Sequence, residues 1–225
     1  MAVVRLRPAD LRSALESDGT SLQFQVQVHV PSATLAGVEA LVRWPHPVLG
    51  MVSFQEMAQL VIQGGLHERF DEWVIRAAAA QAAAWRREGV PLPLIAVNVW
   101  EPTLRSPQLL AWVDGVEGLE LELPRGVASD PAHVPMIGSL RARGARVAAD
   151  SVPEIEVDTL KLRYPVRRED VEAGRARGLR VVAEGVEDER QQAEVLAAGC
   201  EVVQGYVFGP EVSASEVSAL ARQRP

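Results

Sequence analysis

Two charged side chains interrupt an apolar run in the stretch Gly37-Val38-Glu39-Ala40-Leu41-Val42-Arg43-Trp44. If this stretch is a β-strand, Glu39, Leu41 and Arg43 share one face because side chains alternate along a strand. A carboxylate and a guanidinium on a buried face need polar partners. The other interpretation is an edge strand whose charges are solvated. The rest of the chain favours the first interpretation if it repeats the pattern.

Apolar segments alternate with amphipathic segments along most of the chain. We expect strands at residues 23–30, 37–43, 94–99, 119–123, 146–149, 159–162, 180–183 and 201–203, and helices at 11–16, 53–63, 67–88, 131–143, 167–177, 189–198 and 212–222. Strands that alternate with helices are typical of a parallel sheet. Eight such strands without a linker predict one α/β domain over residues 1–225, a TIM-like (β/α)8 barrel.

The composition limits the location and the partners of the protein. A net charge of −7 without a lysine and arginine cluster argues against a nucleic acid polymer as a partner. The single cysteine, Cys200, excludes an intrachain disulfide and suits a reducing compartment. The longest apolar stretch, residues 77–85, is too short to span a bilayer, and the N-terminus lacks the apolar core of a signal peptide. We therefore expect a cytoplasmic protein without a membrane partner.

Polar residues stand at or near the C-terminal ends of the expected strands, where barrels of this type form their active sites. They are Glu39, Asn98, Glu122, Asp150, Lys161, Glu184 and Gln204. Four carboxylates at one mouth repel one another unless a cation lies between them. The set offers oxygen but neither His nor Cys, which favours Mg²⁺, Mn²⁺ or Ca²⁺ over zinc. Taken singly, such residues could instead be helix caps, turn residues or part of the barrel rim.

Six motifs follow one another in a specific order along the chain. They are Glu39-Ala40-Leu41-Val42-Arg43-Trp44 with His46-Pro47, Val97-Asn98-Val99, Leu119-Glu120-Leu121-Glu122, Leu160-Lys161-Leu162, Val182-Ala183-Glu184-Gly185-Val186-Glu187 and Gln204-Gly205-Tyr206-Val207-Phe208. In this order they resemble the EAL-domain family, bacterial phosphodiesterases that linearise cyclic di-GMP. The resemblance covers roughly residues 10–212 and implies cyclic di-GMP as the ligand.

The resemblance also implies a role for each polar residue. The implied ligands of a first metal ion are Glu39, Asn98, Glu122 and Asp150, and Glu184 would join Asp150 at a second ion. Lys161 would orient or activate the attacking water, and Gln204 would support the water shell of the metals. Arg43 would hold a ligand phosphate, and Gln27 would lie near a guanine or a phosphate. Paired cations would neutralise the phosphate and lower the pKa of a bridging water.

The chain departs from the family at the implied second metal. The family has two successive aspartates there, whereas Ser151 follows Asp150 in this chain, and a hydroxyl is a poor ligand for a hard dication. Ten residues separate Asp150 from Lys161, fewer than a parallel crossover with its helix needs. We therefore expect the helix between these two strands to be shortened or missing. Arg125 and Arg163 stand where the family has a glutamate and an aspartate.

These departures predict a degenerate EAL domain without phosphodiesterase activity, which acts as a cyclic di-GMP-binding or protein-interacting regulatory module. At most a single Mg²⁺ or Mn²⁺ site would survive, and the implied catalytic residues Lys161 and Glu184 would be vestigial. The alternative is a weakly active, metal-dependent cyclic di-GMP phosphodiesterase, which the retention of both residues favours. A protein partner follows from the missing helix, which is expected to leave Val147 and Leu160 poorly covered.

Overall fold

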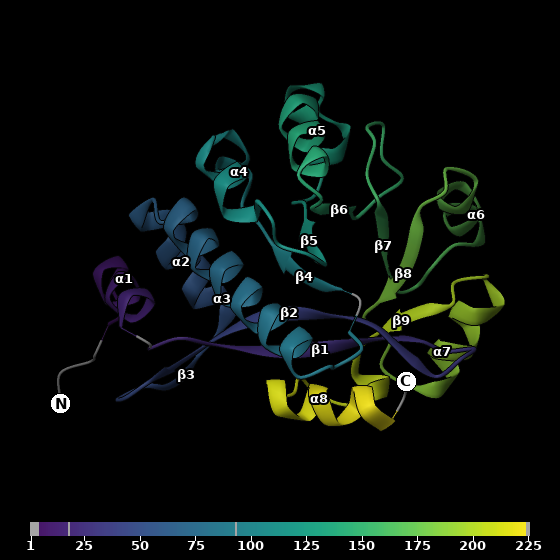
Figure 1. Ribbon diagram of the computed structural model, residues 1–225, viewed down its shortest axis with the longest axis horizontal. Coiled ribbons are helices and arrows are strands. Elements are labelled where there is room, and N and C mark those ends of the chain that lie inside the picture. The colour runs from purple at the N-terminus through teal and green to yellow at the C-terminus, as the bar shows by residue number, and fades with distance from the viewer. Residues whose placement is uncertain (1–4, 18, 93, 224–225) are drawn as a thin grey trace.

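A computed structural model describes residues 5–17, 19–92 and 94–223. Within these residues the strands are β1 (Ser21–His29), β2 (Thr34–His46), β3 (Gly50–Val52), β4 (Ile95–Asn98), β5 (Leu119–Glu122), β6 (Arg146–Ala149), β7 (Thr159–Arg163), β8 (Arg180–Glu184) and β9 (Val202–Gln204). The main helices are α1 (Pro8–Glu16), α2 (Phe54–Gly64), α3 (His67–Arg87), α4 (Gln108–Val113), α5 (Val134–Ala142), α6 (Arg168–Ala176), α7 (Glu189–Ala197) and α8 (Ala214–Gln223). Figure 1 shows helices placed around the strands.

The strands close into a barrel, which confirms the predicted fold class. The hydrogen-bonded order β1-β9-β8-β7-β6-β5-β4-β2 closes through a pairing between β1 and β2. Pairs from β2 through β4 to β9 are parallel, whereas β1 is antiparallel to both of its neighbours. The expectation of a wholly parallel sheet is therefore wrong for β1. A short turn at residues 30–33 joins it to β2, and such a turn can connect only antiparallel strands.

A hairpin extends β2 beyond the barrel. The chain continues as a strand through Pro45 to His46 and pairs with β3, with Trp44 opposite Val52. Pro45 and Pro47 with Gly50 are typical of a loop, but an edge strand tolerates proline, which cannot donate a hydrogen bond. The strand at Gly50–Val52 is thus an addition that the sequence pattern did not predict.

Local signals place most helices correctly. The Ser53 hydroxyl accepts a hydrogen bond from the Glu56 backbone N–H at 3.2 Å, and the Glu56 carboxylate accepts one from the Ser53 N–H at 3.2 Å. This reciprocal pair is a capping box, and it explains why the helix expected at residues 53–63 begins there. By contrast, α4 lies in a stretch to which the sequence pattern assigned no element.

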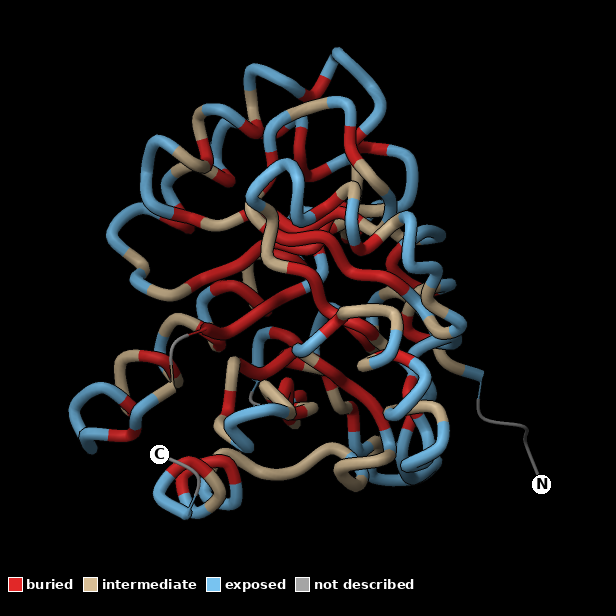
Figure 2. The backbone as a smooth tube through the Cα atoms, turned by 90° about the vertical axis from the view of Figure 1, so that its right-hand side faces the viewer, coloured by how far each residue is buried: buried red, intermediate tan, exposed pale blue. Residues whose placement is uncertain are grey.

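The two faces of β1 meet different surroundings. Its apolar face turns outward to the helices, where Phe24 contacts Trp85 of α3 edge to face at 4.9 Å between ring centroids. The Trp85 indole N–H donates to the carbonyl of Ala214 at the start of α8 at 3.2 Å. The glutamine face turns inward, where Gln27 is fully buried. Buried residues follow the strands through the centre of the molecule, and exposed residues lie on the outer turns (Figure 2).

No helix connects β6 to β7, as the residue spacing predicted. Figure 1 shows this connection as a plain loop between α5 and α6. The loop is held by the Asp158 carboxylate, which accepts from the Val147 backbone N–H at 2.9 Å and pairs with Arg141 of α5 at 3.2 Å. The expectation that Val147 and Leu160 would be poorly covered is wrong, because both are 0% exposed. Gly174 allows α6 to lie close against the Leu160 side chain.

Candidate functional site

Lys161 lies at the centre of the polar cluster at the C-terminal end of the barrel. Its ammonium nitrogen is 2.5 Å from Glu122 Oε1, 2.8 Å from Glu39 Oε2 and 3.5 Å from Glu184 Oε2. The lysine side chain is only 4% exposed. The structure therefore brings together four of the residues predicted from strand ends, with the cation between the three carboxylates.

Strand register explains why these side chains meet. Asn98 of β4 lies directly opposite Glu122 of β5, and Glu39 of β2 lies opposite Ala96, two residues before Asn98 on the same face of β4. Parallel strands in register place residues near their C-terminal ends at the same level of the barrel, so their inward side chains converge. Asn98 Nδ2 donates to Glu39 Oε1 at 2.7 Å. The amide thereby fixes the glutamate that also faces Lys161.

Lys161, Glu39 and Glu122 shift one another's pKa values. Burial opposes the charge on Lys161, but the negative charges of Glu122, Glu39 and Glu184 outweigh it and raise the pKa of Lys161 far above its ordinary value. Burial would also raise the pKa of Glu39, yet the charge of Lys161 and several hydrogen bonds lower it overall. For Glu122, burial and the nearby Glu39 carboxylate raise the pKa to about 8. The cluster thus favours a charged lysine and an ionised Glu39, and Glu122 is the carboxylate that takes up a proton most readily.

Gln204 links the cluster to β1. Its Nε2 donates to Glu39 Oε2 at 2.6 Å and to Gln25 Oε1 at 2.8 Å. Gln27, predicted to lie near the ligand, is instead fully buried below this level, where it donates to Gln204 Oε1 and accepts from Arg180 Nη2 at 2.7 Å. The structure therefore does not bring Gln27 to the mouth.

Gln25 and Gln23 occupy the positions on β1 that face the mouth. Gln25 pairs in register with Glu39, and Gln23 Oε1 accepts from Arg43 Nε at 2.9 Å. Because β1 runs antiparallel to β2, earlier residues of β1 lie nearer the mouth. The alternation of glutamines in the sequence identified the correct face, but only the strand register selects which glutamine reaches the ligand level.

Arg43 lines a second cavity beside the cluster. This cavity has a volume of about 420 Å³ and is lined mainly by apolar side chains, among them Phe54, Phe70 and Val74. The polar cavity around Lys161 has a volume of about 250 Å³, and Glu39 and Asn98 line both. Within the described residues, the guanidinium of Arg43 pairs with Glu211 at 3.3 Å. A polar and an apolar compartment thus share one wall at the barrel mouth.

Two arginines pair with the carboxylates farthest from β2. Arg125 Nε is 3.0 Å from Asp150 Oδ2, and Arg163 Nη2 is 3.5 Å from Glu184 Oε1. Both arginine side chains are mostly exposed, at 84% and 77%. The sequence analysis noted both as departures but did not predict that they pair with candidate metal ligands. Ser151, next to Asp150, is exposed.

A buried carboxylate outside the mouth supports the end of β4. Asp71 of α3 is 0% exposed and accepts from the Trp100 backbone N–H at 2.8 Å, two residues after Asn98. Burial raises the pKa of Asp71 to about 7, and the nearby Thr103 hydroxyl and the Trp100 N–H offset the effect only in part. Asp71 was not among the residues predicted from the sequence. A single acid beside Phe70 and Val74 on the buried face of α3 was the available signal.

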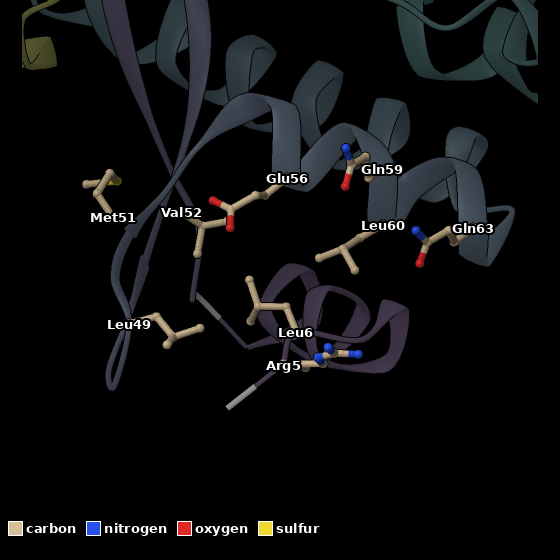
Figure 3. Close-up of a pocket in the computed structure, with 9 residues that line it drawn as sticks. All are labelled: Arg5, Leu6, Leu49, Met51, Val52, Glu56, Gln59, Leu60 and Gln63. Carbon is tan, nitrogen blue, oxygen red and sulfur yellow. The ribbon is translucent and has the colours of Figure 1, made fainter. Parts of the chain in front are cut away.

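A larger cavity than either of the two at the barrel mouth lies away from the cluster. It has a volume of about 690 Å³ and lies between β3, α2 and the segment before α1 (Figure 3). Arg5 and Glu56 are its ionisable side chains, and Leu6, Leu49 and Leu60 supply apolar walls. Among the described residues, its lining offers one arginine and one glutamate but no cluster of acids and bases like the one around Lys161. The barrel mouth is therefore the better candidate site.

The closed barrel and the polar cluster at its C-terminal end define an α/β-barrel protein with a ligand site in the position that barrel enzymes use. A family model for the EAL domain matches residues 9–153, more than half of the chain. The chain therefore belongs to the EAL-domain family. The match ends at Pro153, inside the loop that lacks a helix. Among residues 5–17, 19–92 and 94–223, no helix is both long and apolar enough to cross a bilayer.

The chain also resembles curated relatives, one of which is named as a cyclic di-GMP phosphodiesterase. The chain is 30% identical over 226 residues to cyclic di-GMP phosphodiesterase PA2567 of Pseudomonas aeruginosa, a match that covers 85% of this chain and 38% of that protein. It is 29% identical over 244 residues to the oxygen sensor protein DosP of Escherichia coli, covering 93% of this chain and 30% of that protein. The chain thus spans less than two fifths of the length of these relatives.

Solved structures share the fold. The PaMucR phosphodiesterase in complex with c-di-GMP superimposes with a TM-score of 0.82 at 27% identity, covering 93% of this chain and 98% of that one. The FimX EAL domain of Xanthomonas citri, also in complex with c-di-GMP, gives a TM-score of 0.79 at 20% identity, covering 91% and 92%. The second likeness establishes the fold alone.

EAL phosphodiesterases generally depend on divalent metal ions, so the donor set must be tested against such a centre. Oxygen donors of the right kind are present, but within the described residues no three His, Cys, Asp or Glu side chains come together to hold an ion. Lys161 lies between the glutamates, and arginines pair with Asp150 and Glu184. Ser151 adds no charge. The residues as arranged do not fit a two-metal centre.

Proposed function

We propose that this chain is a degenerate EAL domain that binds cyclic di-GMP at the barrel mouth without hydrolysing it and acts as a cytoplasmic regulatory module. The observation that carries the proposal is that Asp150 is paired with an arginine and is not followed by a second carboxylate. The Asp150 carboxylate pairs with Arg125, Ser151 follows it, and the connection to β7 has no helix. A two-metal phosphoryl transfer needs both ions to neutralise the phosphate and to produce the nucleophile.

The two cavities at the mouth support a dinucleotide ligand. Cyclic di-GMP combines anionic phosphodiesters with large planar purines, and the mouth offers a polar compartment beside an apolar one. Arg43 and Gln204 are the proposed ligand-binding residues, and Gln25 replaces Gln27 as the β1 residue at the ligand level. Guanidinium groups hold phosphate oxygens through paired N–H donors.

Nucleotide binding as proposed does not require the single Mg²⁺ or Mn²⁺ ion that the resemblance implied. The ligands of that ion would be Glu39, Asn98, Glu122 and Asp150, which hold hydrogen-bond or ion-pair partners in this structure. When bound, such an ion would supply charge for the phosphate. Binding would require Lys161 and Arg125 to release their carboxylates.

The test is a calorimetric titration of cyclic di-GMP into the protein, first with Mg²⁺ or Mn²⁺ and then with EDTA, combined with a product assay. We expect micromolar or tighter binding, on the order of −8 kcal/mol, with no linear dinucleotide formed. Arg43→Ala should abolish the binding heat. Arg76→Ala is the matched control, because Arg76 lies on α3 and is 65% exposed, in a pair with Glu72. Absence of heat in every condition would contradict the proposal.

The second candidate function is a slow, metal-dependent cyclic di-GMP phosphodiesterase. The retained Lys161 and Glu184, 3.5 Å apart, favour it. Product formation that depends on Mn²⁺ would establish this function. Ser151→Asp should not restore turnover if the missing helix is what disables the site, and a clear gain from this change alone would contradict that reasoning.

A protein partner is the remaining part of the proposal. Exposed apolar side chains lie on the β2–β3 hairpin and on α2, namely Val48, Leu49, Met51, Phe54 and Ile62. Several exposed apolar side chains on neighbouring elements are a candidate interaction surface. Pull-down with the intact protein and with Met51→Ser and Ile62→Ser variants would identify a partner, and equal capture by both forms would exclude this surface.

A further inference from the structure

Three side-chain cations enter the polar cavity at the barrel mouth. All three line it, and Lys161 is 4% exposed, whereas the rim arginines Arg125 and Arg163 are 84% and 77% exposed. Each of the three contacts a carboxylate that also lines the cavity. The arginines contact Asp150 and Glu184, the two carboxylates that Lys161 holds least or not at all.

The charges of this cavity are nearly balanced. Its lining contains four carboxylates, on Glu39, Glu122, Asp150 and Glu184, and the three cations Lys161, Arg125 and Arg163. Counted formally, these leave one net negative charge, whereas Lys161 alone would leave three. Carboxylates this close repel one another unless positive charge lies between them. The guanidinium groups reduce the need for a metal ion to supply that charge.

The geometry points to Arg125 and Arg163 as replacements for divalent metal charge, and we propose that the cavity takes an anionic phosphodiester without a metal ion. The identity of the phosphodiester as cyclic di-GMP rests on the proposed function; the metal-independence does not. Exposed ion pairs contribute about 0–1 kcal/mol. The rim arginines can therefore turn from their carboxylates to a phosphate, for which a guanidinium has matching paired donors.

The first test measures metal binding directly and needs no nucleotide. Mn²⁺ is titrated into the protein and followed by its electron paramagnetic resonance signal. The wild type should show no saturable site tighter than about 1 mM, the weak end of protein sites for hard cations. The double variant Arg125→Gln, Arg163→Gln should bind Mn²⁺ about tenfold more tightly, because Asp150 and Glu184 lose their cationic partners. A micromolar site in the wild type, or an unchanged double variant, would overturn the inference.

The second test measures nucleotide binding with and without metal. In EDTA, cyclic di-GMP should bind the wild type as tightly as in Mg²⁺, and the double variant about tenfold more weakly, a loss of about 1.4 kcal/mol. Arg76→Gln, an exposed arginine on α3, should match the wild type in both tests. Binding only with a divalent ion would overturn the inference and leave the proposed function standing. Failure to bind under any condition would refute the proposed function, while the Mn²⁺ titration still decides the inference.

Discussion

Replacing Asp71 by asparagine should remove part of the pH dependence of the protein's stability. Asp71 is fully buried in α3, and its carboxylate accepts a hydrogen bond from the Trp100 backbone N–H at 2.8 Å. Burial raises the pKa of this carboxyl from 3.8 to about 7 in the folded protein. The folded protein therefore binds more protons than the unfolded chain between about pH 4 and pH 7. Asparagine keeps an oxygen that accepts from Trp100 but cannot ionise.

The sign and the size of the effect follow from this shift. Because the folded state holds the proton more tightly, stability falls as pH rises through the window and stays low above it. A difference of roughly 3 pH units corresponds to about 4 kcal/mol in full. Between pH 5 and pH 8, the loss is about 3 kcal/mol, since part of the window lies below pH 5. The Asp71→Asn variant should not show this loss.

Urea denaturation at pH 5, 6, 7 and 8 measures the effect. The free energy of unfolding of Asp71→Asn minus that of the wild type should increase with pH by about 3 kcal/mol. Subtracting the wild type removes the titration of other groups. Asp114→Asn, at an exposed position after α4, is the matched control and should give a constant difference. A flat difference for Asp71→Asn across this range would refute the argument that burial raises its pKa.

Three further changes test the site and the barrel. Lys161→Met leaves two buried glutamates without their cation and should lower the free energy of unfolding by about 3–5 kcal/mol. The loss should be larger at pH 8 than at pH 6, and a loss below about 1 kcal/mol in urea denaturation would contradict the reasoning. Glu211→Gln frees Arg43 from its ion pair and should strengthen cyclic di-GMP binding severalfold in calorimetry; unchanged or weaker binding would count against Arg43 as a phosphate ligand. Gly205→Ala places a methyl group against the backbone of Val186 at φ +152° and should destabilise the fold by more than about 2 kcal/mol in thermal melts. Gly138→Ala is the control, because Gly138 lies in α5 with open space around it, and it should be neutral or stabilising.

The fold class and most elements were predictable because their signals are local. The capping residue Ser53 and the apolar periodicity after it determine where α2 begins without reference to the rest of the chain. The same holds for the short connection between Asp150 and Lys161, where residue count alone excluded a full helix. The antiparallel direction of β1 was not predicted, because it depends on which strands lie on either side of it.

Some residues of the candidate site were also predictable from the sequence, and others were not. The residues at strand ends were found because parallel strands bring equivalent positions together. The resemblance implied Gln27 near the ligand. Gln25 lies on the same face of β1, and which of the two reaches the mouth depends on a register that only the folded sheet has. The contacts of Arg125 and Arg163 were not predictable, since they depend on where long, flexible side chains meet carboxylates from other strands. The covering of Val147 depends on packing across a loop.

The place of β1 in the barrel also constrains how the chain folds. The strand pairs early with β2 across a short turn, but its other edge remains open until β9 arrives, where Gln27 meets Gln204 across 177 positions of sequence. Contacts between such distant residues form slowly because a long loop must first close. We therefore expect closure of the β1–β9 seam to be a late step of folding. Until then the free edge of β1 exposes unpaired backbone groups, which makes the partly folded chain prone to pair with other chains.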